Sequence, residues 1–110
     1  MAPASADARI YQLQARVLAA AAHPISLAII DFLKDGERCV CDIARHVDAN
    51  RSNVSRHLGL MLRAGLVDCR KEGLRQMYRL RAPCVVNFLA CVNKVLRHEL
   101  ARTQAALARL

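Results

Sequence analysis

Residues 50–58, Asn50-Arg51-Ser52-Asn53-Val54-Ser55-Arg56-His57-Leu58, carry the strongest structural signal in the chain. Successive residues of an α-helix lie about 100° apart around its axis, so this sequence gives a helix with two opposite faces. The apolar face comprises Val54, His57, Leu58, Met61 and Leu62, and the outward face comprises Ser52, Ser55, Arg56, Gly59 and Arg63. We therefore predict a helix that Asn50 caps and Gly65 ends, buried on one side and open to a partner on the other.

A short helix precedes it. Val40, Ile43, Ala44 and Val47 recur at spacings of three and four and predict one buried face over two turns. Asp48-Ala49-Asn50 then forms a turn. A short helix, a tight turn and a longer helix predict a helix-turn-helix.

The elements before this motif are also helical. We expect a flexible arm over residues 1–6 and a first helix over about 8–22 that Asp7 caps. His23-Pro24 breaks that helix, and a second helix follows from Pro24 to about Lys34, where Asp35-Gly36 ends it. The region before the short helix is thus predicted to contain no strand.

The C-terminal part adds a hairpin and a long helix. Residues 66–71 and 74–80 read as two strands around Glu72-Gly73, which form a basic wing. Residues 83–110 contain no further helix breaker and have two apolar stripes, more than a small core covers. We expect a homodimer that joins through this terminal helix. The fold class is mainly α with a small β-hairpin, a single winged helix-turn-helix domain over residues 1–110.

The composition favours a polyanionic partner. The 110 residues include 17 Lys and Arg against 9 Asp and Glu, which gives a net charge of +8. No stretch reaches the roughly 18 apolar residues that span a bilayer, and the first residues lack the pattern of a signal peptide. We therefore expect a cytoplasmic protein with no membrane partner. There the five cysteines stay reduced and form no structural disulfide.

The polar face of the second motif helix and the hairpin are suited to double-stranded DNA. Hydroxyl and arginine donors reach phosphates and base edges, and Gly59 allows the backbone to approach closely. Arg56 is our candidate for reading guanine, while His57 falls on the apolar face and is expected to pack. The candidate DNA-binding residues are Ser52, Asn53, Ser55, Arg56, Arg63, Arg70, Lys71 and Arg75.

Cys39-Val40-Cys41-Asp42 places two thiols at the start of the short helix. Inside a helix, residues i and i+2 point about 200° apart, so both thiols could bind one ion only if Cys39 precedes the helix in extended backbone. Metal binding would then bend the start of the motif, which makes Cys39 and Cys41 candidate metal ligands. The alternative is that both pack as small apolar residues.

Several segments resemble a known family. Glu37-Arg38-Cys39-Val40-Cys41-Asp42-Ile43 resembles the metal box of the ArsR/SmtB metalloregulators. That family's recognition helix and wing are similar to three further segments: Val54-Ser55-Arg56-His57-Leu58, Leu62-Arg63-Ala64-Gly65-Leu66-Val67 and Tyr78-Arg79-Leu80. The resemblance covers residues 18–80. It implies a dimeric repressor without enzymatic activity that leaves its operator when a metal or metalloid binds.

The resemblance implies arsenite or antimonite as the effector ahead of cadmium or lead, with no permanently bound cofactor. Arsenic-sensing members often carry a third cysteine three positions after the pair, where this chain has Ala44. Arsenite binds about three thiolates, so a third would come from Cys69, Cys84 or Cys91 of the same or the partner chain. The chain also has Ser26 where an arginine is usual after His-Pro.

Three other functions are compatible with parts of the pattern. The same repressor could sense oxidants or reactive sulfur through its dithiol. A thiol oxidoreductase would need a strand before the thiol pair, and the sequence predicts none. A winged helix could also bind RNA, which a comparison of retention on duplex DNA and on RNA would decide.

Overall fold

The computed structural model describes residues 6–110, so residues 1–5 of the arm expected at 1–6 lie outside them. Helix α1 (Ala6–Ala21) begins earlier than expected. Ala6 is therefore helical and Asp7 is in the first turn, so the prediction that Asp7 caps the helix was wrong. An acidic side chain in the first turn still interacts favourably with the helix dipole.

The helix-turn-helix is confirmed. Helix α2 (Pro24–Leu33) is capped by His23, whose Nδ1 accepts the Ile25 N–H at 3.1 Å. Helices α3 (Val40–Val47) and α4 (Arg51–Ala64) are joined by a turn in which Asp48 has left-handed backbone, with φ of 56°. An aspartate tolerates this conformation better than most residues because its short polar side chain bonds locally.

The wing is a three-stranded sheet rather than a two-stranded hairpin. Strands β2 (Val67–Glu72) and β3 (Arg75–Leu80) form the hairpin, and β1 (Arg38–Cys39) pairs with the other side of β3. All pairings are antiparallel. The prediction of no strand before the thiol pair was wrong, because a two-residue strand is too short to produce an alternating pattern. Antiparallel pairing on the wing differs from the alternating strand and helix units expected of a thiol oxidoreductase.

The core joins α2, α3, α4 and the base of the wing. Its fully buried side chains include Ile29, Ile43, Val54, Leu58 and Met61. Three of these come from α4, so the helix that reads as the recognition helix also supplies the centre of the core.

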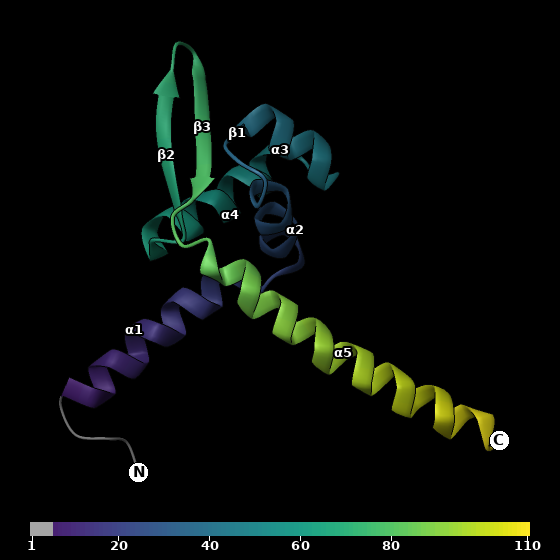
Figure 1. The fold of residues 1–110 in the computed structure, drawn as a ribbon. Coiled ribbons are helices and arrows are strands. Elements are labelled where there is room, and N and C mark those ends of the chain that lie inside the picture. The colour runs from purple at the N-terminus through teal and green to yellow at the C-terminus, as the bar shows by residue number, and fades with distance from the viewer. Residues whose placement is uncertain (1–5) are drawn as a thin grey trace.

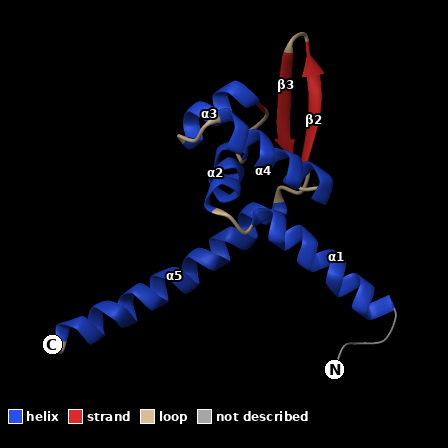
Figure 2. Ribbon diagram, turned by 180° about the vertical axis from the view of Figure 1, so that it is seen from behind, coloured by secondary structure: helices blue, strands red, loops and turns tan. Residues whose placement is uncertain are grey.

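Helix α1 and helix α5 (Cys84–Ala108) extend away from the core in diverging directions, on the side opposite the wing (Figures 1 and 2). None of the residues of α5 is buried. Large apolar side chains are exposed on both helices: Ile10, Tyr11, Leu13, Leu18, Phe88, Val92, Val95, Leu96, Leu100 and Leu107. Val85, Val86 and Leu89 at the start of α5 pack partly against the core, whereas most of the apolar side chains beyond them are uncovered in a single chain.

Among residues 6–110, no single helix combines the length and the apolar character needed to cross a membrane. Helices α1 and α2 meet that test only as a pair, with a bend of 84° between them.

Candidate nucleic-acid interface and dithiol site

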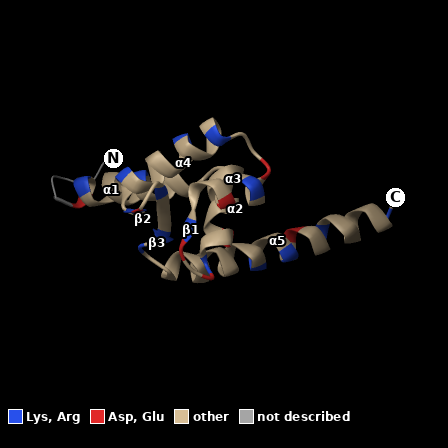
Figure 3. Ribbon diagram, turned by 90° about the horizontal axis from the view of Figure 1, so that it is seen from above, with Lys and Arg blue, Asp and Glu red and all other residues tan. Residues whose placement is uncertain are grey.

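The outward face of α4 is the first part of the candidate interface. The Asn50 side chain accepts the Asn53 N–H at 2.8 Å and thereby caps the helix. Ser52, Ser55, Arg56 and Arg63 are exposed, and Asn53 is half-buried. Basic residues recur along this helix (Figure 3). This side of α4 therefore presents hydroxyl, amide and guanidinium donors to solvent.

The opposite face of α4 is buried as the helical spacing predicts. Val54, His57, Leu58 and Met61 all have exposed fractions of 3% or less. Leu62 is the exception on this face, because 41% of its surface is exposed. The core covers a narrower arc of the helix than the apolar residues span, so the prediction that Leu62 is buried was wrong.

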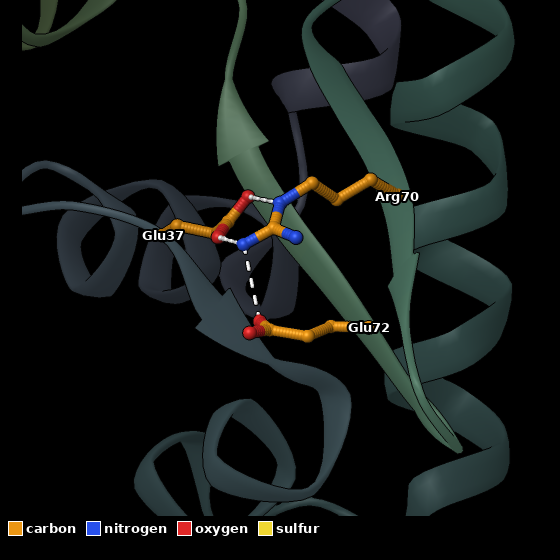
Figure 4. A network of polar contacts seen from close by, with 3 residues as sticks. All are labelled: Glu37, Arg70 and Glu72. Atoms are coloured by element: carbon orange, nitrogen blue, oxygen red, sulfur yellow. Dashed lines mark hydrogen bonds and ion pairs between the residues drawn. The ribbon is translucent and has the colours of Figure 1, made fainter.

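The base of the wing is tied to the segment before β1 by an ion-pair network. Arg70 Nε and Nη2 donate to the two carboxylate oxygens of Glu37 at 2.8 and 2.6 Å, and Nη2 also donates to Glu72 at 3.1 Å (Figure 4). The Arg70 guanidinium holds the pKa of Glu37 below its usual range. A planar guanidinium that binds a carboxylate with two parallel bonds fixes direction as well as distance. Arg70 therefore orients the wing in this structure.

The remaining wing cations are placed differently. Lys71 and Arg75 are exposed, and no ion pair involves them among residues 6–110. Arg79 pairs with Asp68 at 3.4 Å. Of the predicted DNA-binding residues on the wing, Lys71 and Arg75 thus present their charge to solvent, whereas Arg70 shares its charge with two carboxylates.

Cys39 and Cys41 occupy the backbone geometry that a shared ligand requires. Cys39 lies in β1 and is the N-cap residue of α3, with extended backbone at φ −81° and ψ 156°. It therefore precedes the helix, while Cys41 lies in the first helical turn. Cys39 is buried and Cys41 is exposed.

Asp42 lies next to this thiol pair. The Cys39 thiol and then Arg45, whose Nη2 donates to Asp42 at 2.5 Å, hold the pKa of Asp42 below its usual range. The pairing of Asp42 with His46, which their spacing also allowed, does not form. His46 instead stacks on Phe32, with ring centroids 4.0 Å apart.

Both thiols line a cleft of about 270 Å³ that also contains residues of the recognition helix and of the wing. Arg51, the first residue of α4, lies on its wall. Lys71 and Arg75 contribute from the wing, and the remaining lining residues are Val40, Leu74 and Gln76. Arg51 could not be predicted as part of this site from the sequence, because only the fold brings the starts of α3 and α4 together with the wing.

The other cysteines lie elsewhere. Paired residues in a sheet share a face, and Cys69 pairs with Tyr78 whereas Cys39 pairs with Met77, one position along β3. Cys69 and Cys39 are therefore on opposite faces of the sheet. Cys84 and Cys91 are exposed on α5. Among residues 6–110, no three Cys, His, Asp or Glu side chains lie close enough to hold one metal ion.

Comparison with known proteins identifies the family. The family model "Bacterial regulatory protein, arsR family" matches residues 23–68. The HTH-type transcriptional regulator Rv0081 of Mycobacterium tuberculosis is 33% identical over 99 residues, which are 89% of this chain and 87% of that protein. This chain belongs to the ArsR family.

Two further relatives have names that describe an assembly and a kind of regulation. The homodimeric winged helix-turn-helix DNA-binding domain of Mb0332 from Mycobacterium bovis, a possible ArsR-family transcriptional regulator, is 36% identical with a TM-score of 0.76. The match covers 93% of this chain and 95% of that domain. The arsenical resistance operon repressor of Staphylococcus xylosus is 33% identical over 70 residues, which are 64% of this chain and 67% of that repressor.

The ionisation of Tyr78, on β3 of the wing, should lower the stability of this ArsR-family chain at alkaline pH. Burial, together with the neighbouring Cys69, raises the pKa of Tyr78 to about 12. Because the unfolded chain loses this proton near pH 10, the contribution of Tyr78 to the free energy of unfolding should be constant below about pH 10 and fall between about pH 10 and 12. Urea unfolding across this range measures it, with Tyr78→Phe as the control. If both proteins lose stability equally, Tyr78 is not the group responsible.

Proposed function

We propose that this protein is a homodimeric repressor that binds operator DNA through α4 and the wing and dissociates when a thiophilic ion binds Cys39 and Cys41. The effector we propose is arsenite or antimonite. The observation that carries the proposal is the cleft in which both thiols meet the first residue of the recognition helix and two wing cations.

The DNA-binding half rests on the two faces of α4. Its buried face fixes the rotation of the helix, so Ser52, Ser55 and Arg56 point outward as a set. A helix of this kind fits the major groove, where arginine donates two hydrogen bonds to guanine. Lys71 and Arg75 extend to one side on the wing, where a phosphate contact adds affinity without reading sequence.

A second copy of the chain is the proposed cover for α1 and α5. The uncovered apolar side chains on both helices support this, as does the homodimeric assembly of the Mycobacterium bovis relative. A two-fold dimer presents two recognition helices. We therefore expect an inverted-repeat operator with half-sites about one helical turn apart.

The cleft supplies a physical link between effector and DNA. A metalloid bound by both thiols would draw the buried Cys39 and the exposed Cys41 toward one centre, within about 4 Å of each other. Cys39 belongs to both β1 and the cap of α3, so this movement changes the pairing of β1 with β3 and the start of the helix-turn-helix. Arg51, Lys71 and Arg75 line the same cleft, so a metalloid bound there also changes the surroundings of three cations that are proposed to contact DNA phosphates.

The third ligand is proposed to come from outside the cleft. The sheet register directs Cys69 to the other face, which leaves Cys84 and Cys91 as the thiols of this chain or its partner that could approach. The two are about 10.5 Å apart along α5, so only one of them would serve a given ion.

The recognition claim predicts different effects for two arginines. Arg56→Ala should weaken binding by about 1 to 3 kcal/mol on a duplex that the wild-type protein selects from a randomised pool (the selected duplex), because it loses base contacts. Arg75→Ala should weaken the selected duplex and a scrambled duplex of the same composition equally. Fluorescence anisotropy at several salt concentrations measures both. If Arg56→Ala prefers the selected duplex over the scrambled duplex as strongly as the wild-type protein does, Arg56 does not read bases.

Substitution of Gly59 should change the stability of α4 and the affinity for DNA in opposite directions. A methyl group at this position would lie 3.6 Å from Arg63 Nη1, an ordinary contact, and alanine favours a helix by about 1 kcal/mol over glycine. Gly59→Ala should therefore raise the free energy of unfolding while it lowers affinity for the selected duplex. Urea unfolding and anisotropy give the two values. A more stable variant with unchanged affinity would show that DNA does not approach α4 closely here.

The sensor claim predicts that Cys39→Ser and Cys41→Ser each keep affinity for the selected duplex but lose dissociation by arsenite. Anisotropy of labelled duplex titrated with arsenite, antimonite, cadmium and lead under reducing conditions measures the response. Cys69→Ser is the matched control and should respond as wild type does, whereas Cys84→Ser or Cys91→Ser should reduce the response if that residue is the third ligand.

Intact mass spectrometry of the treated protein distinguishes bound arsenic from a disulfide or polysulfide bridge between the thiols. A Cys39, Cys41 double variant that still dissociates at wild-type arsenite concentrations would show that the pair only packs.

A further inference from the structure

His57 is a buried ionisable residue on the recognition helix, next to Arg56 in the sequence. Its exposed fraction is 3%, and Ser26 of α2, which is fully buried, lies against it. Ser26 Oγ is 3.2 Å from His57 Nδ1. On the other side of the ring, Arg56 Nη2 is 3.4 Å from Nε2. One imidazole thus connects a buried hydroxyl to the exposed guanidinium that is proposed to read DNA.

The donors and acceptors allow only one arrangement of protons. Guanidinium groups donate and never accept, so Nε2 must be the bare, accepting nitrogen of the ring. A neutral imidazole then carries its proton on Nδ1, which donates to Ser26 Oγ. Ser26 therefore fixes the tautomer in which His57 can accept a hydrogen bond from Arg56.

We infer that His57 and Ser26 are positioning residues for DNA recognition: they hold the Arg56 guanidinium in place before DNA arrives. The inference rests on the proposed role of Arg56 as a base-reading residue. An arginine in solvent loses side-chain entropy when it is immobilised on DNA, and a guanidinium that is already held loses less. Nη2 uses one N–H on His57, which leaves the other donors for a base edge.

The arrangement requires a neutral His57, and the surroundings favour that form. The titratable or charged groups that face the ring are His23, with ring centroids 4.1 Å apart, and Arg56. Burial, followed by the influence of His23 and Arg56, lowers the pKa of His57 below 6.5. Protonation places a hydrogen on Nε2 and a charge beside Arg56. Positioning should therefore be complete at neutral pH and lost as the pH falls through this lowered pKa.

Folding stability should depend on pH in the same direction as the positioning of Arg56. The unfolded chain takes up the His57 proton near pH 6.5, before the folded chain does. Stability should consequently decline as the pH falls below about 6.5. DNA measurements at acid pH must therefore be accompanied by circular dichroism to show that the protein stays folded.

The first experiment determines which imidazole nitrogen of His57 carries the proton in the protein without DNA. Nitrogen-15 NMR of the labelled imidazole should show His57 with its proton on Nδ1 and a bare Nε2 at neutral pH, and Ser26→Ala should change this distribution. A proton on Nε2 in the wild-type protein would overturn the inference without reference to DNA.

The second experiment measures discrimination, the ratio of affinities for the selected and scrambled duplexes. Ser26→Ala should lower this ratio by about tenfold, the effect of one hydrogen bond to a charged group, and leave the scrambled affinity unchanged. His57→Gln offers Arg56 an acceptor that does not titrate, so its ratio should stay near that of wild type at neutral pH. As the pH is lowered over the range in which circular dichroism shows a folded protein, the ratio of His57→Gln should remain constant while that of wild type falls. His46→Gln, on the exposed α3 histidine, should fall as wild type does.

The outcomes separate the two claims. If Arg56→Ala discriminates as well as wild type, base reading by Arg56 fails and the positioning role fails with it. If Arg56→Ala loses discrimination but Ser26→Ala keeps it, only the positioning role fails. A rise in affinity for the selected duplex in Ser26→Ala would mean that His57 holds Arg56 back from DNA, which also overturns the inference.

Discussion

The buried face of α4 determines how the core and the helix-turn-helix are arranged. Val54, Leu58 and Met61 are fully buried, and each would stabilise the fold by about 1.5 to 3 kcal/mol relative to exposure. A rotation of α4 that exposed other side chains to DNA would remove all three from the core. Hydrophobic packing therefore sets which side chains of α4 face outward, and substitutions on the outward face leave the core unchanged.

The same small core covers only the ends of α1 and α5 that adjoin it. Six large apolar side chains of α5 are exposed: Phe88, Val92, Val95, Leu96, Leu100 and Leu107. If a second copy buried most of them, the gain would be on the order of 10 kcal/mol before the entropy of association is subtracted. That magnitude is large enough to stabilise the homodimer proposed above.

The helices could be predicted from sequence because each depends on local signals. Pro24, Asn50 and Gly65 act within one turn of the helix ends, and the apolar spacing sets the buried faces. Strand β1 could not be predicted, since its two residues become a strand only when β3 lies beside them. The Glu37–Arg70 pair joins residues 33 positions apart, and no local pattern indicates it. The thiol pair was visible in the sequence, but the cleft that gives it neighbours was not.

Ser26 illustrates what sequence and structure contribute separately. The sequence marks it as unusual, because an arginine is usual there in proteins that this chain resembles, and gives no reason. The structure places its hydroxyl against His57, which only a residue of this size reaches from within a fully buried site. An arginine there would be a charge without solvent and would have to extend past the ring or displace it. In this chain the residue at position 26 is therefore part of the buried support of α4, which a local sequence pattern does not indicate.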